Sequence, residues 1–585
     1  MLLPKIYEIE EILRKKNKSI DKLSCCILRN ISVENIELYL KYYLSLDNKN
    51  LAIDFGNYDN IYQDSLKNSL IHKKNYDFII VFLWLPNFSD ILSNKVKSSN
   101  LKIINKEIKR LNEYCMQTIK NIRQYSKAPI LWSTYDNLDN YNSSSIHTHN
   151  LQTTENIIDK LNSNLKKIIS KSQEVFLLDL NKSKSKSNNN LFYDKRYWYS
   201  FRSPFGTEGL KYLSYEISNF IRAVFLPKYK CLVLDCDNVL WGGILGETGY
   251  DKINLINDNG DSEFIDFQKE VLNLYNTGTI LAINSKNNLE DVMEVFKKNK
   301  NMILKENHFA SIKANWNDKA SNLREIAKEL NIGLNSLVFA DDSDFEINLI
   351  KKEIPEVKTL HLPIEGSEYN KDKLIACGYF DKMKITKEDK QKGKMYVDEK
   401  KRKVLLEKIT DIKTYLETLK MKMNIQICKD ENLDRVEQMI QKTNQFNLTT
   451  KRIKRNEILK IIKDKKKYFT YILSLKDKFG DYGTCGLSIV SKKHKSVYFD
   501  IFLMSCRVIG RGVEKAFLIK IMNEINAKNN IDTFYGKFIQ TAKNSQVKDF
   551  YLNNGFDISR KDINSIVFSF SSKNIKSLKI PKYLK

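Results

Sequence analysis

Short apolar runs alternate with longer polar stretches in the first part of the chain, and this pattern predicts strands that alternate with helices. The runs are CCILRNI (25–31), FIIVFLWL (78–85), APILWSTY (128–135) and VFLLDL (175–180), and each has the length of one strand. Runs that are apolar at nearly every position indicate burial on both faces, as in a parallel sheet covered by helices. We therefore expect an α/β domain over residues 1–225.

The same alternation recurs further along the chain and then changes character. A strand opens at Lys230 with KCLVLDCDN, and LAINS and SLVFADD follow, which predicts a second parallel α/β domain over 226–380. Residues 381–420 are rich in Lys and Glu at helical spacing and predict a helical connector. Residues 421–585 combine several strands with a helix from Gly512, which favours a domain with a mixed sheet.

Composition narrows the classes of partner. The chain has 585 residues and a formal net charge of +26, but only 15 of its 97 basic residues are Arg. Proteins that bind nucleic acid favour arginines gathered in a patch, whereas the lysines here are dispersed. We therefore expect no nucleic-acid partner, while an acidic protein partner fits the charge.

The cysteines and the lengths of the apolar runs indicate in which cellular compartment the protein works. The nine cysteines contain no CxxC pair and are too sparse for a disulfide framework, which indicates a reducing compartment. The first residues form no apolar signal segment, and the longest apolar run, from Phe78 to Pro86, is far shorter than a membrane span. The expectation is a cytoplasmic protein with no membrane insertion.

Polar side chains with phosphate chemistry follow three strands of the second domain. Asp235 and Asp237 stand two residues apart after CLVL, so both side chains point to the same side. Carboxylates that share one crevice are stable together when a cation lies between them, and Mg²⁺ prefers oxygen ligands. Ser285 ends a second strand, and Asp341 and Asp342 end a third. The carboxyl ends of parallel strands meet at one edge of the sheet, where ligands bind.

Lys319 precedes a helix in the same domain and adds a positive charge. The ordered set of DxD, Ser, Lys and DD fits phosphoryl transfer through a covalent aspartyl phosphate. This region resembles the haloacid dehalogenase (HAD) superfamily of phosphatases. The resemblance implies these roles: nucleophile, Asp235; general acid/base, Asp237; phosphate-binding residues, Ser285, Lys286 and Lys319; Mg²⁺ ligands, Asp235, Asp237, Asp341 and Asp342.

Three longer runs, LDCDNVLWGGILGETG, LAINSKNN and QKTNQFNLTTKR, are similar to the FkbH-like proteins, which carry a subfamily IIIC HAD phosphatase and often an acyltransferase-like domain. The chain departs from the family at Cys236, which strand alternation points away from the crevice, as a small core residue. The run SDFE is also unusual, although Glu346 keeps an acid in the family's place. The short gaps between Asp237, Ser285 and Lys319 leave no room for a large cap domain. By analogy we expect an open site for a large or carrier-bound substrate.

A turn with two glycines joins a strand to a helix in the last domain, where VYFDIFLMSC runs into RVIGRG. Glycines at such a turn let backbone N–H groups approach a diphosphate. The pattern resembles the loop that binds the pantetheine and diphosphate of coenzyme A (CoA) in the GCN5-related N-acetyltransferases (GNATs). The downstream run NSQVKDFYLNNGF resembles a late segment of that fold, with Tyr551 as general acid. The loop residues so implied are Arg507, Val508, Gly510, Arg511 and Gly512.

Cys506 lies beside this turn, where the GNAT fold separates two strands to admit a thioester. Two interpretations stand for it. It is either a thiol that accepts an acyl group and passes it to phosphopantetheine, helped by Arg507, or a buried core cysteine. Cys231 is a weaker candidate for the same thiol chemistry.

The first domain resembles an SGNH-hydrolase-like or flavodoxin-like fold that has lost its catalytic residues. Gly-Asp-Ser is absent after the first strand, where the chain has LRNIS, and the late stretch YWYSFRSPFGTEGL has no histidine. His147 and His149 form an HxH pair in a loop, which is too few ligands for a metal site. We expect a docking or scaffold role.

Three functions are consistent with these observations. The first is a Mg²⁺-dependent enzyme that takes a glyceryl unit from a phosphorylated three-carbon metabolite, 1,3-bisphosphoglycerate, and loads it on the phosphopantetheine of an acyl carrier protein with loss of phosphate. The second is an acyl-CoA-dependent N-acyltransferase acting on an amino sugar or small amine, with a separate phosphatase site. The third, a non-catalytic scaffold, is disfavoured because both DxD aspartates and the lysine are present. The acyl group, the pathway and the oligomeric state stay open.

Overall fold

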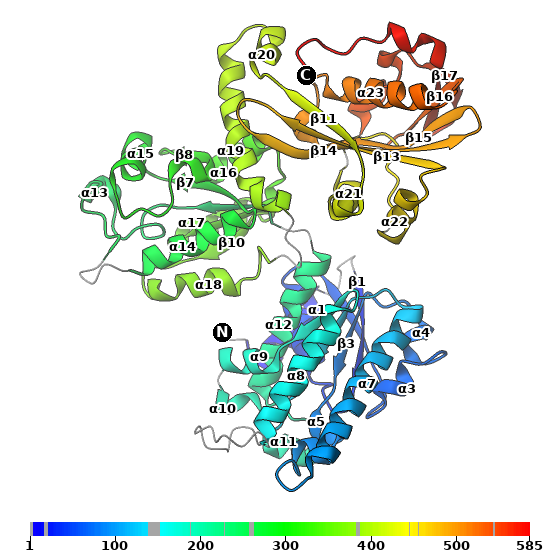
Figure 1. Cartoon of the computed structure of the whole chain (residues 1–585). Helices are drawn as coiled ribbons and strands as arrows, with labels where there is room; N and C mark the ends of the chain where they lie inside the picture. Colours follow the sequence, from blue (N-terminus) through cyan, green and yellow to red (C-terminus); the bar gives the residue numbers. More distant parts are fainter. Residues whose placement is uncertain are drawn as a thin grey trace. The chain divides into compact units, whose positions relative to one another are not determined.

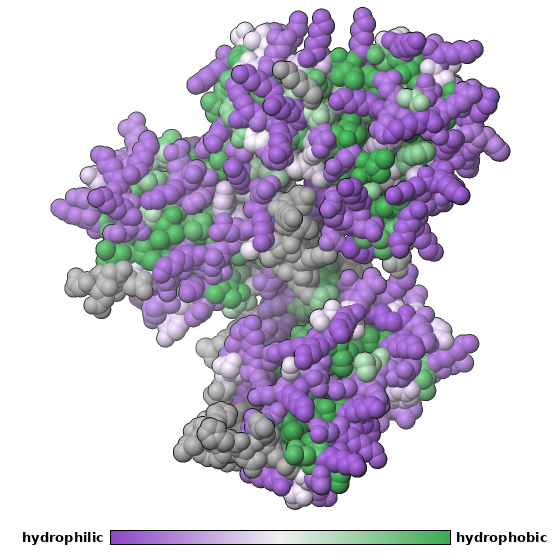
Figure 2. All heavy atoms as spheres, viewed as in Figure 1, coloured by the Kyte–Doolittle hydropathy of each residue, from purple (hydrophilic) through white to green (hydrophobic). Residues whose placement is uncertain are grey.

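The structure is a computed structural model that describes residues 4–16, 22–138, 153–187, 189–226, 229–256, 262–381, 387–443, 445–453, 455–541 and 544–584. The chain divides into two compact units, Met1–Leu226 and Pro227–Lys585 (Figure 1). Most of the visible surface is hydrophilic (Figure 2). No helix among the described residues is long and apolar enough to span a bilayer.

The first unit is built on a parallel sheet with the strand order β2-β1-β3-β4-β5. Its strands are β1 (Lys22–Arg29), β2 (Asn50–Phe55), β3 (Phe78–Phe82), β4 (Ile130–Ser133) and β5 (Val175–Leu178). The longer helices are α1 (Ile6–Lys16), α2 (Ile36–Ser45), α7 (Leu101–Tyr125), α8 (Thr154–Ser170) and α12 (Thr207–Phe225). The shorter ones are α3 (Ile61–Asp64), α4 (Leu70–Lys73), α5 (Leu85–Phe88), α6 (Asp90–Ser93), α9 (Leu180–Lys186), α10 (Asn189–Phe192) and α11 (Lys195–Phe201).

Both faces of this first sheet are buried, which explains its nearly continuous apolar strands. Along β3, Phe78 and Ile80 belong to one core cluster, whereas Ile79 and Val81 belong to another. Successive strand residues point to opposite faces, so each face has its own core.

The second unit begins with another parallel sheet, in the order β10-β9-β6-β7-β8. Its strands are β6 (Cys231–Leu234), β7 (Ile280–Ser285), β8 (Phe309–Ala314), β9 (Leu337–Asp341) and β10 (Lys358–His361). The helices around it are α13 (Leu245–Thr248), α14 (Glu263–Asn276), α15 (Leu289–Lys298), α16 (Lys319–Leu330), α17 (Asp344–Glu353) and α18 (Asn370–Ala376). The central strand β6 therefore lies between β7 and β9, and the carboxyl ends of these three strands share one edge.

The remaining part of the second unit contains a mixed sheet in the order β11-β13-β14-β15-β16-β18-β17, with β12 beside β15. The strands are β11 (Lys422–Ile427), β12 (Phe446–Asn447), β13 (Tyr468–Lys476), β14 (Asp481–Lys493), β15 (Ser496–Met504), β16 (Thr533–Ile539), β17 (Asp557–Lys561) and β18 (Ser565–Ser571). The helices are α20 (Ile412–Thr418), α21 (Leu433–Lys442), α22 (Arg455–Lys463) and α23 (Val513–Lys528), with a short 3₁₀ segment η8 (Ser572–Ser577) after β18. Only β15 and β16 pair in parallel among these described strands. The predicted fold class, two parallel α/β sheets followed by a mixed sheet, is confirmed.

One long helix, α19 (Lys387–Lys408), contacts both sheets of the second unit. On one side Tyr396 packs against the core of the parallel sheet, and Gly393 lies so close to the ring of Tyr275 that a side chain would not fit. On the other side Arg402 binds Asp477 through two hydrogen bonds, of 2.7 Å from Nε and 2.8 Å from Nη2. Both side chains of this ion pair are almost fully buried, with 3% and 0% exposed.

Replacement of Asp477 by Asn tests the role of this buried pair. The change would remove the fully buried counter-charge of Arg402 and leave it only Glu399, which lies 3.2 Å away and is shared with Arg511. Loss of a buried partner costs up to about 3–5 kcal/mol of the free energy of unfolding. The measurement is urea denaturation of the whole chain. The matched control is Asp481→Asn, because Asp481 pairs with Lys476 at 2.9 Å on the surface, where such pairs contribute about 1 kcal/mol or less. Equal losses in the two variants would contradict the prediction.

Candidate active site

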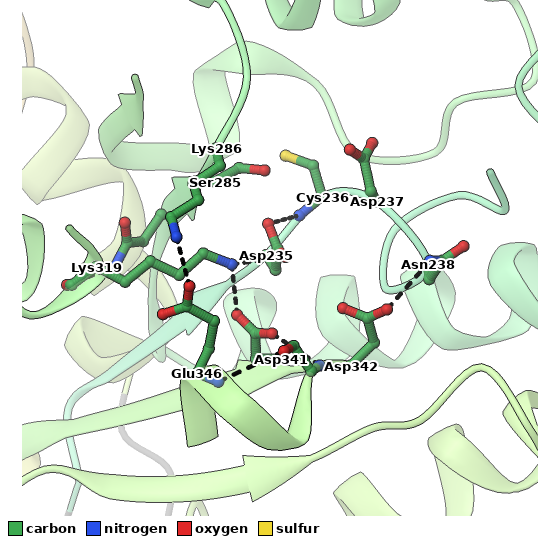
Figure 3. A network of polar contacts seen from close by, with 12 residues as sticks. Asp235, Cys236, Asp237, Asn238, Ser285, Lys286, Lys319, Asp341, Asp342 and Glu346 are labelled. Atoms are coloured by element: carbon green, nitrogen blue, oxygen red, sulfur yellow. Dashed lines mark hydrogen bonds and ion pairs between the residues drawn. The ribbon is translucent and has the colours of Figure 1, made fainter. Parts of the chain in front are cut away.

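Three carboxylates meet at the carboxyl edge of the second sheet. Asp235 follows β6, Asp341 ends β9, and Asp342 is the next residue. One oxygen atom from each lies within 4.8 Å of the other two, an arrangement that can hold a metal ion (Figure 3). Asp235 and Asp341 are buried, and Asp342 is half-buried. Clustered carboxylate oxygens are the donors that Mg²⁺ prefers.

Lys319 brings one positive charge into this cluster. Its Nζ lies 2.8 Å from Asp235 Oδ2 and 2.6 Å from Asp341 Oδ2, and its side chain is 4% exposed. Lys319 is the first residue of α16, and the preceding Asp318 caps the helix by accepting a hydrogen bond from the backbone N–H of Ser321 at 2.7 Å. The cap fixes the start of the helix and so directs the lysine into the site.

The cluster holds more negative than positive charge, and its pKa values reflect this. Burial and the charge of Asp235 raise the pKa of Asp341 to about 7, even though Lys319 opposes the rise. Burial also raises the pKa of Asp342, against the hydrogen bond that Asn238 Nδ2 donates to it at 3.1 Å. A divalent cation would supply the missing positive charge, so these residues fit a Mg²⁺ ion.

The carboxylate of Asp237 is not part of the cluster that Asp235, Asp341 and Asp342 form. It accepts hydrogen bonds from Trp241 Nε1 at 2.9 Å, from the backbone N–H of Leu245 at 3.2 Å and from Asn287 Nδ2 at 3.0 Å. Of the four side chains expected to bind the metal, three are therefore together and Asp237 is separate. Burial raises the pKa of Asp237, which favours a carboxyl group that holds a proton.

Asn287 connects Asp237 to the serine at the end of β7, a link that the sequence reasoning missed. Its Nδ2 also donates to Ser285 Oγ at 3.1 Å, and Ser285 is 1% exposed. The signal was present in the run NSKNN, which places an amide two residues after the serine. Cys236 is fully buried in the core cluster of this domain, as expected for a small core residue.

Glu346 and Lys286 form a second ion pair beside the cluster. Lys286 Nζ lies 2.6 Å from Glu346 Oε1, and the Glu346 side chain is 7% exposed while that of Lys286 is 43% exposed. The Lys286 side chain is therefore partly exposed, while its ammonium group is directed to Glu346 (Figure 3). This placement is compatible with the predicted contact to a phosphate but assigns Lys286 a partner in the resting chain.

The turn before α23 differs from the expected anion loop in the direction of its arginines. Arg511 Nη2 lies 3.0 Å from Glu399 of α19, and Nη1 contacts the Tyr482 hydroxyl. Arg507 Nε donates to Ser505 Oγ at 3.2 Å, and its guanidinium contacts the sulfur of Met395. Both arginines therefore face neighbouring side chains, and Arg511 is buried by them.

The other residues predicted to bind CoA or to act in acyl transfer are mostly buried or lie in the glycine turn. Val508 is fully buried, and Gly510 and Gly512 adopt positive φ angles of 78° and 73°, the conformation for which glycine is suited. Tyr551 is fully buried among phenylalanine rings, and its hydroxyl has no hydrogen-bond partner among the described residues. Burial raises the pKa of Tyr551. The side chain of Cys506 lies outside the described residues, so its role stays a prediction.

The loop after β1, where an SGNH hydrolase would have its nucleophile, is held in place by side-chain hydrogen bonds. Asn30 Nδ2 donates to the carbonyl of Trp84 at 3.0 Å, and its Oδ1 accepts from the N–H of Trp84 at 2.6 Å. The side chain thus ties the loop after β1 to the loop after β3. His147 and His149 lie outside the described residues.

Solved structures that are similar to this chain include one whose match extends over about two thirds of it. The N-terminal part of the protein BF1531 from Bacteroides fragilis, containing a phosphatase domain and complexed with Mg, is 25% identical with a TM-score of 0.58. The match covers 66% of this chain and 100% of that chain. No protein-family model and no curated protein matches the chain. Together with the site geometry, this similarity supports an enzyme.

Smaller matches are N-acetyltransferases. The ribosomal-protein-S18-alanine N-acetyltransferase from Escherichia coli is 12% identical with a TM-score of 0.21, and covers 26% of this chain and 93% of its own. Mutant forms of the spermidine/spermine N-acetyltransferase SpeG from Vibrio cholerae are 11% identical with a TM-score of 0.22, and the match covers 26% of this chain and 96% of that chain. At these TM-scores the likeness carries no conclusion about activity.

The raised pKa of Asp341 predicts a pH-dependent affinity for Mg²⁺. Below about pH 7 this carboxyl holds a proton that the metal must displace, so the affinity falls about ten-fold per pH unit between pH 7 and pH 5 and is flat above pH 7. Isothermal titration calorimetry with MgCl₂ at pH 5, 6, 7 and 8 measures the slope. In buffers of different ionisation enthalpy, proton release should appear only below pH 7. An affinity that does not change from pH 5 to pH 7 would refute this prediction.

Proposed function

We propose that the second unit carries a Mg²⁺-dependent, HAD-type phosphoryl-transfer site centred on Asp235. The observation that carries this proposal is the cluster of Asp235, Asp341 and Asp342 around the Lys319 ammonium group. In this proposal residues 226–380 form the phosphatase-type domain, 381–420 the connector and 421–585 a GNAT-like domain. Residues 1–225 form a degenerate SGNH-like docking module.

The roles of the residues follow from where their side chains lie. Asp235, Asp341 and Asp342 would hold Mg²⁺, which would neutralise the charge of a bound phosphate. A carboxylate oxygen of Asp235 attacks the phosphorus atom, and the ester oxygen leaves with the proton of Asp237. Water then cleaves the aspartyl phosphate, and Asp237 takes up the proton that the water loses. The net reaction converts a phosphate ester and water into an alcohol and inorganic phosphate.

Lys319 and the polar groups around it support this chemistry. The lysine holds Asp235 in place through its 2.8 Å ion pair and offsets charge near the phosphate. Ser285 ends the adjacent strand, and Lys286 at the rim brings a further ammonium group. The resemblance to the phosphatase domain of BF1531, which binds Mg, supports the same assignment.

We further propose that the chain is FkbH-like and loads a glyceryl unit on an acyl carrier protein. The donor is 1,3-bisphosphoglycerate: a thiolate displaces the phosphate of its acyl phosphate to form a thioester, and the Asp235 site removes the other phosphate as inorganic phosphate. The thioester passes to the phosphopantetheine thiol of the carrier. The net charge of +26 supports an acidic carrier as the partner, because opposite charges speed encounter.

A CoA-dependent N-acyltransferase is the second candidate. The observation that favours it is the parallel pairing of β15 and β16 followed on the β15 side by a glycine turn and helix α23, which is the arrangement expected of a GNAT-like domain. Loading of a carrier protein separates the two candidates, since only the first requires it.

Asp235→Asn tests the phosphatase role. An amide cannot attack phosphorus. In the absence of a carrier protein, where the thiolate route stops after one turnover, steady-state phosphate release from 1,3-bisphosphoglycerate in excess of its spontaneous hydrolysis should therefore fall by about 10³-fold or more. Release is followed with a colorimetric phosphate assay. The control is Asp372→Asn, because Asp372 is exposed on α18 of the same domain. Undiminished release by Asp235→Asn would exclude the aspartyl-phosphate route.

Cys506→Ala tests the acyl-carrying thiol. Without the thiol, transfer of the glyceryl unit to the holo carrier should be lost while phosphate release at Asp235 persists, and intact-protein mass spectrometry of the carrier measures the adduct. Cys485→Ala is the control, because Cys485 is fully buried and its raised pKa keeps the thiol protonated. Full loading by Cys506→Ala would assign this thiol to the core.

A further inference from the structure

The gap between β15 and β16 is filled by the chain itself. The two strands pair only from Ser496 to Phe499 and separate beyond that point. Residues 446–449 enter the gap: the N–H of Leu448 donates to the carbonyl of Phe502 at 3.1 Å, and the N–H of Ile539 donates to the carbonyl of Leu448 at 2.8 Å. The backbone N–H and carbonyl of Leu448 therefore bridge the two strands where they separate.

The turn before α23 is filled as well. The N–H of Gly510 donates to Glu514 Oε1 at 3.2 Å, so a carboxylate of the chain takes the place of an external anion. The second oxygen of Glu514 is buried. The Tyr583 hydroxyl and the ring of Pro581 lie against Gly512, at 2.7 Å and 3.1 Å from where a β-carbon would stand.

The charge of Glu514 also disfavours an anion at the turn before α23. A diphosphate at the turn would meet the carboxylate of Glu514, and like charges in a buried site repel strongly. Arg511 offers no compensation, because its guanidinium is paired with Glu399 and contacts the Tyr482 hydroxyl. Contacts of the chain with itself thus occupy both parts of a CoA cradle, the strand gap and the anion turn.

A row of lysines runs beside the closed turn. After β18 the C-terminal segment 572–584 places Ile575 and Leu584 in the core, and η8 at its start packs against α23. The exposed side chains of this segment include Lys573, Lys576, Lys579 and Lys582, here called the lysine row. Among the described residues none of these four lysines has an ion-pair partner, so the lysine row is available to an acidic surface.

We propose that the C-terminal domain does not bind CoA and instead docks the folded body of an acidic, phosphopantetheine-bearing carrier protein on the lysine row, outside the filled strand gap and turn. This inference rests on the proposed function, whose carrier it places on the chain. The turn at Glu514 is the feature that excludes the diphosphate of CoA. Complementary charge governs the docking, so the association weakens with salt.

The first test measures CoA binding to the full chain by isothermal titration calorimetry. The expected result is no saturable heat and no shift of the thermal midpoint with CoA up to millimolar concentration. Saturable binding at one site per chain would overturn the exclusion of CoA.

The second test measures docking of a holo acyl carrier protein. The double variant Lys576→Glu/Lys579→Glu should weaken carrier binding by about ten-fold or more and flatten its salt dependence. The matched control is Lys465→Glu/Lys466→Glu, which reverses two exposed lysines before β13 and should leave the affinity unchanged. Equal affinity of the two double variants would overturn the lysine row as the docking surface.

Phosphate release separates failure of this inference from failure of the proposed function. Both double variants should release phosphate from 1,3-bisphosphoglycerate at the rate of the unaltered chain, because neither touches the Asp235 site. If the unaltered chain docks the carrier at the lysine row but releases no phosphate above the spontaneous rate, the inference stands and the phosphatase proposal fails. If phosphate is released but CoA binds, the phosphatase proposal stands and the exclusion of CoA fails.

Discussion

The candidate site depends on one buried ammonium group among three carboxylates. Lys319 contacts Asp235 and Asp341 at 2.8 Å and 2.6 Å, and these three side chains are 4%, 9% and 0% exposed. One positive charge cannot balance three negative ones, and burial together with the charge of Asp235 raises the pKa of Asp341. A divalent cation would add two positive charges and so balance the three carboxylates, which is the charge that the proposed Mg²⁺-dependent chemistry supplies.

A second network of buried ion pairs connects helix α19 to the mixed-sheet part of the second unit. Arg402 pairs with Asp477, and Arg511 with Glu399, at 2.7 Å and 3.0 Å. Arg402 and Glu399 belong to α19, which also packs on the parallel sheet, so one helix carries contacts to both sheets. Arg511 thus contacts Glu399 and Tyr482 within the chain, contacts that its position in a glycine turn did not predict.

The part of the site that could be predicted from sequence is the part set by parallel strands. Asp235, Ser285 and Asp341 each follow a recognisable apolar run, and parallel strands bring their carboxyl ends to one edge, so their convergence follows from local patterns. Contacts between distant segments could not be read this way. The pair of Arg511 and Glu399 joins residues 112 apart, and the insertion of residues 446–449 between β15 and β16 depends on tertiary packing that no local pattern encodes.

The most direct test of the central claim is to identify the atom that receives the phosphoryl group. The full chain is mixed with Mg²⁺ and 1,3-bisphosphoglycerate, quenched in acid within the first turnover, digested and mapped by mass spectrometry. The account predicts a phosphoryl group on the peptide that contains Asp235, present only when Mg²⁺ was added. Rapid Mg²⁺-dependent phosphate release, with a phosphoryl group on another residue and none on Asp235, would contradict it.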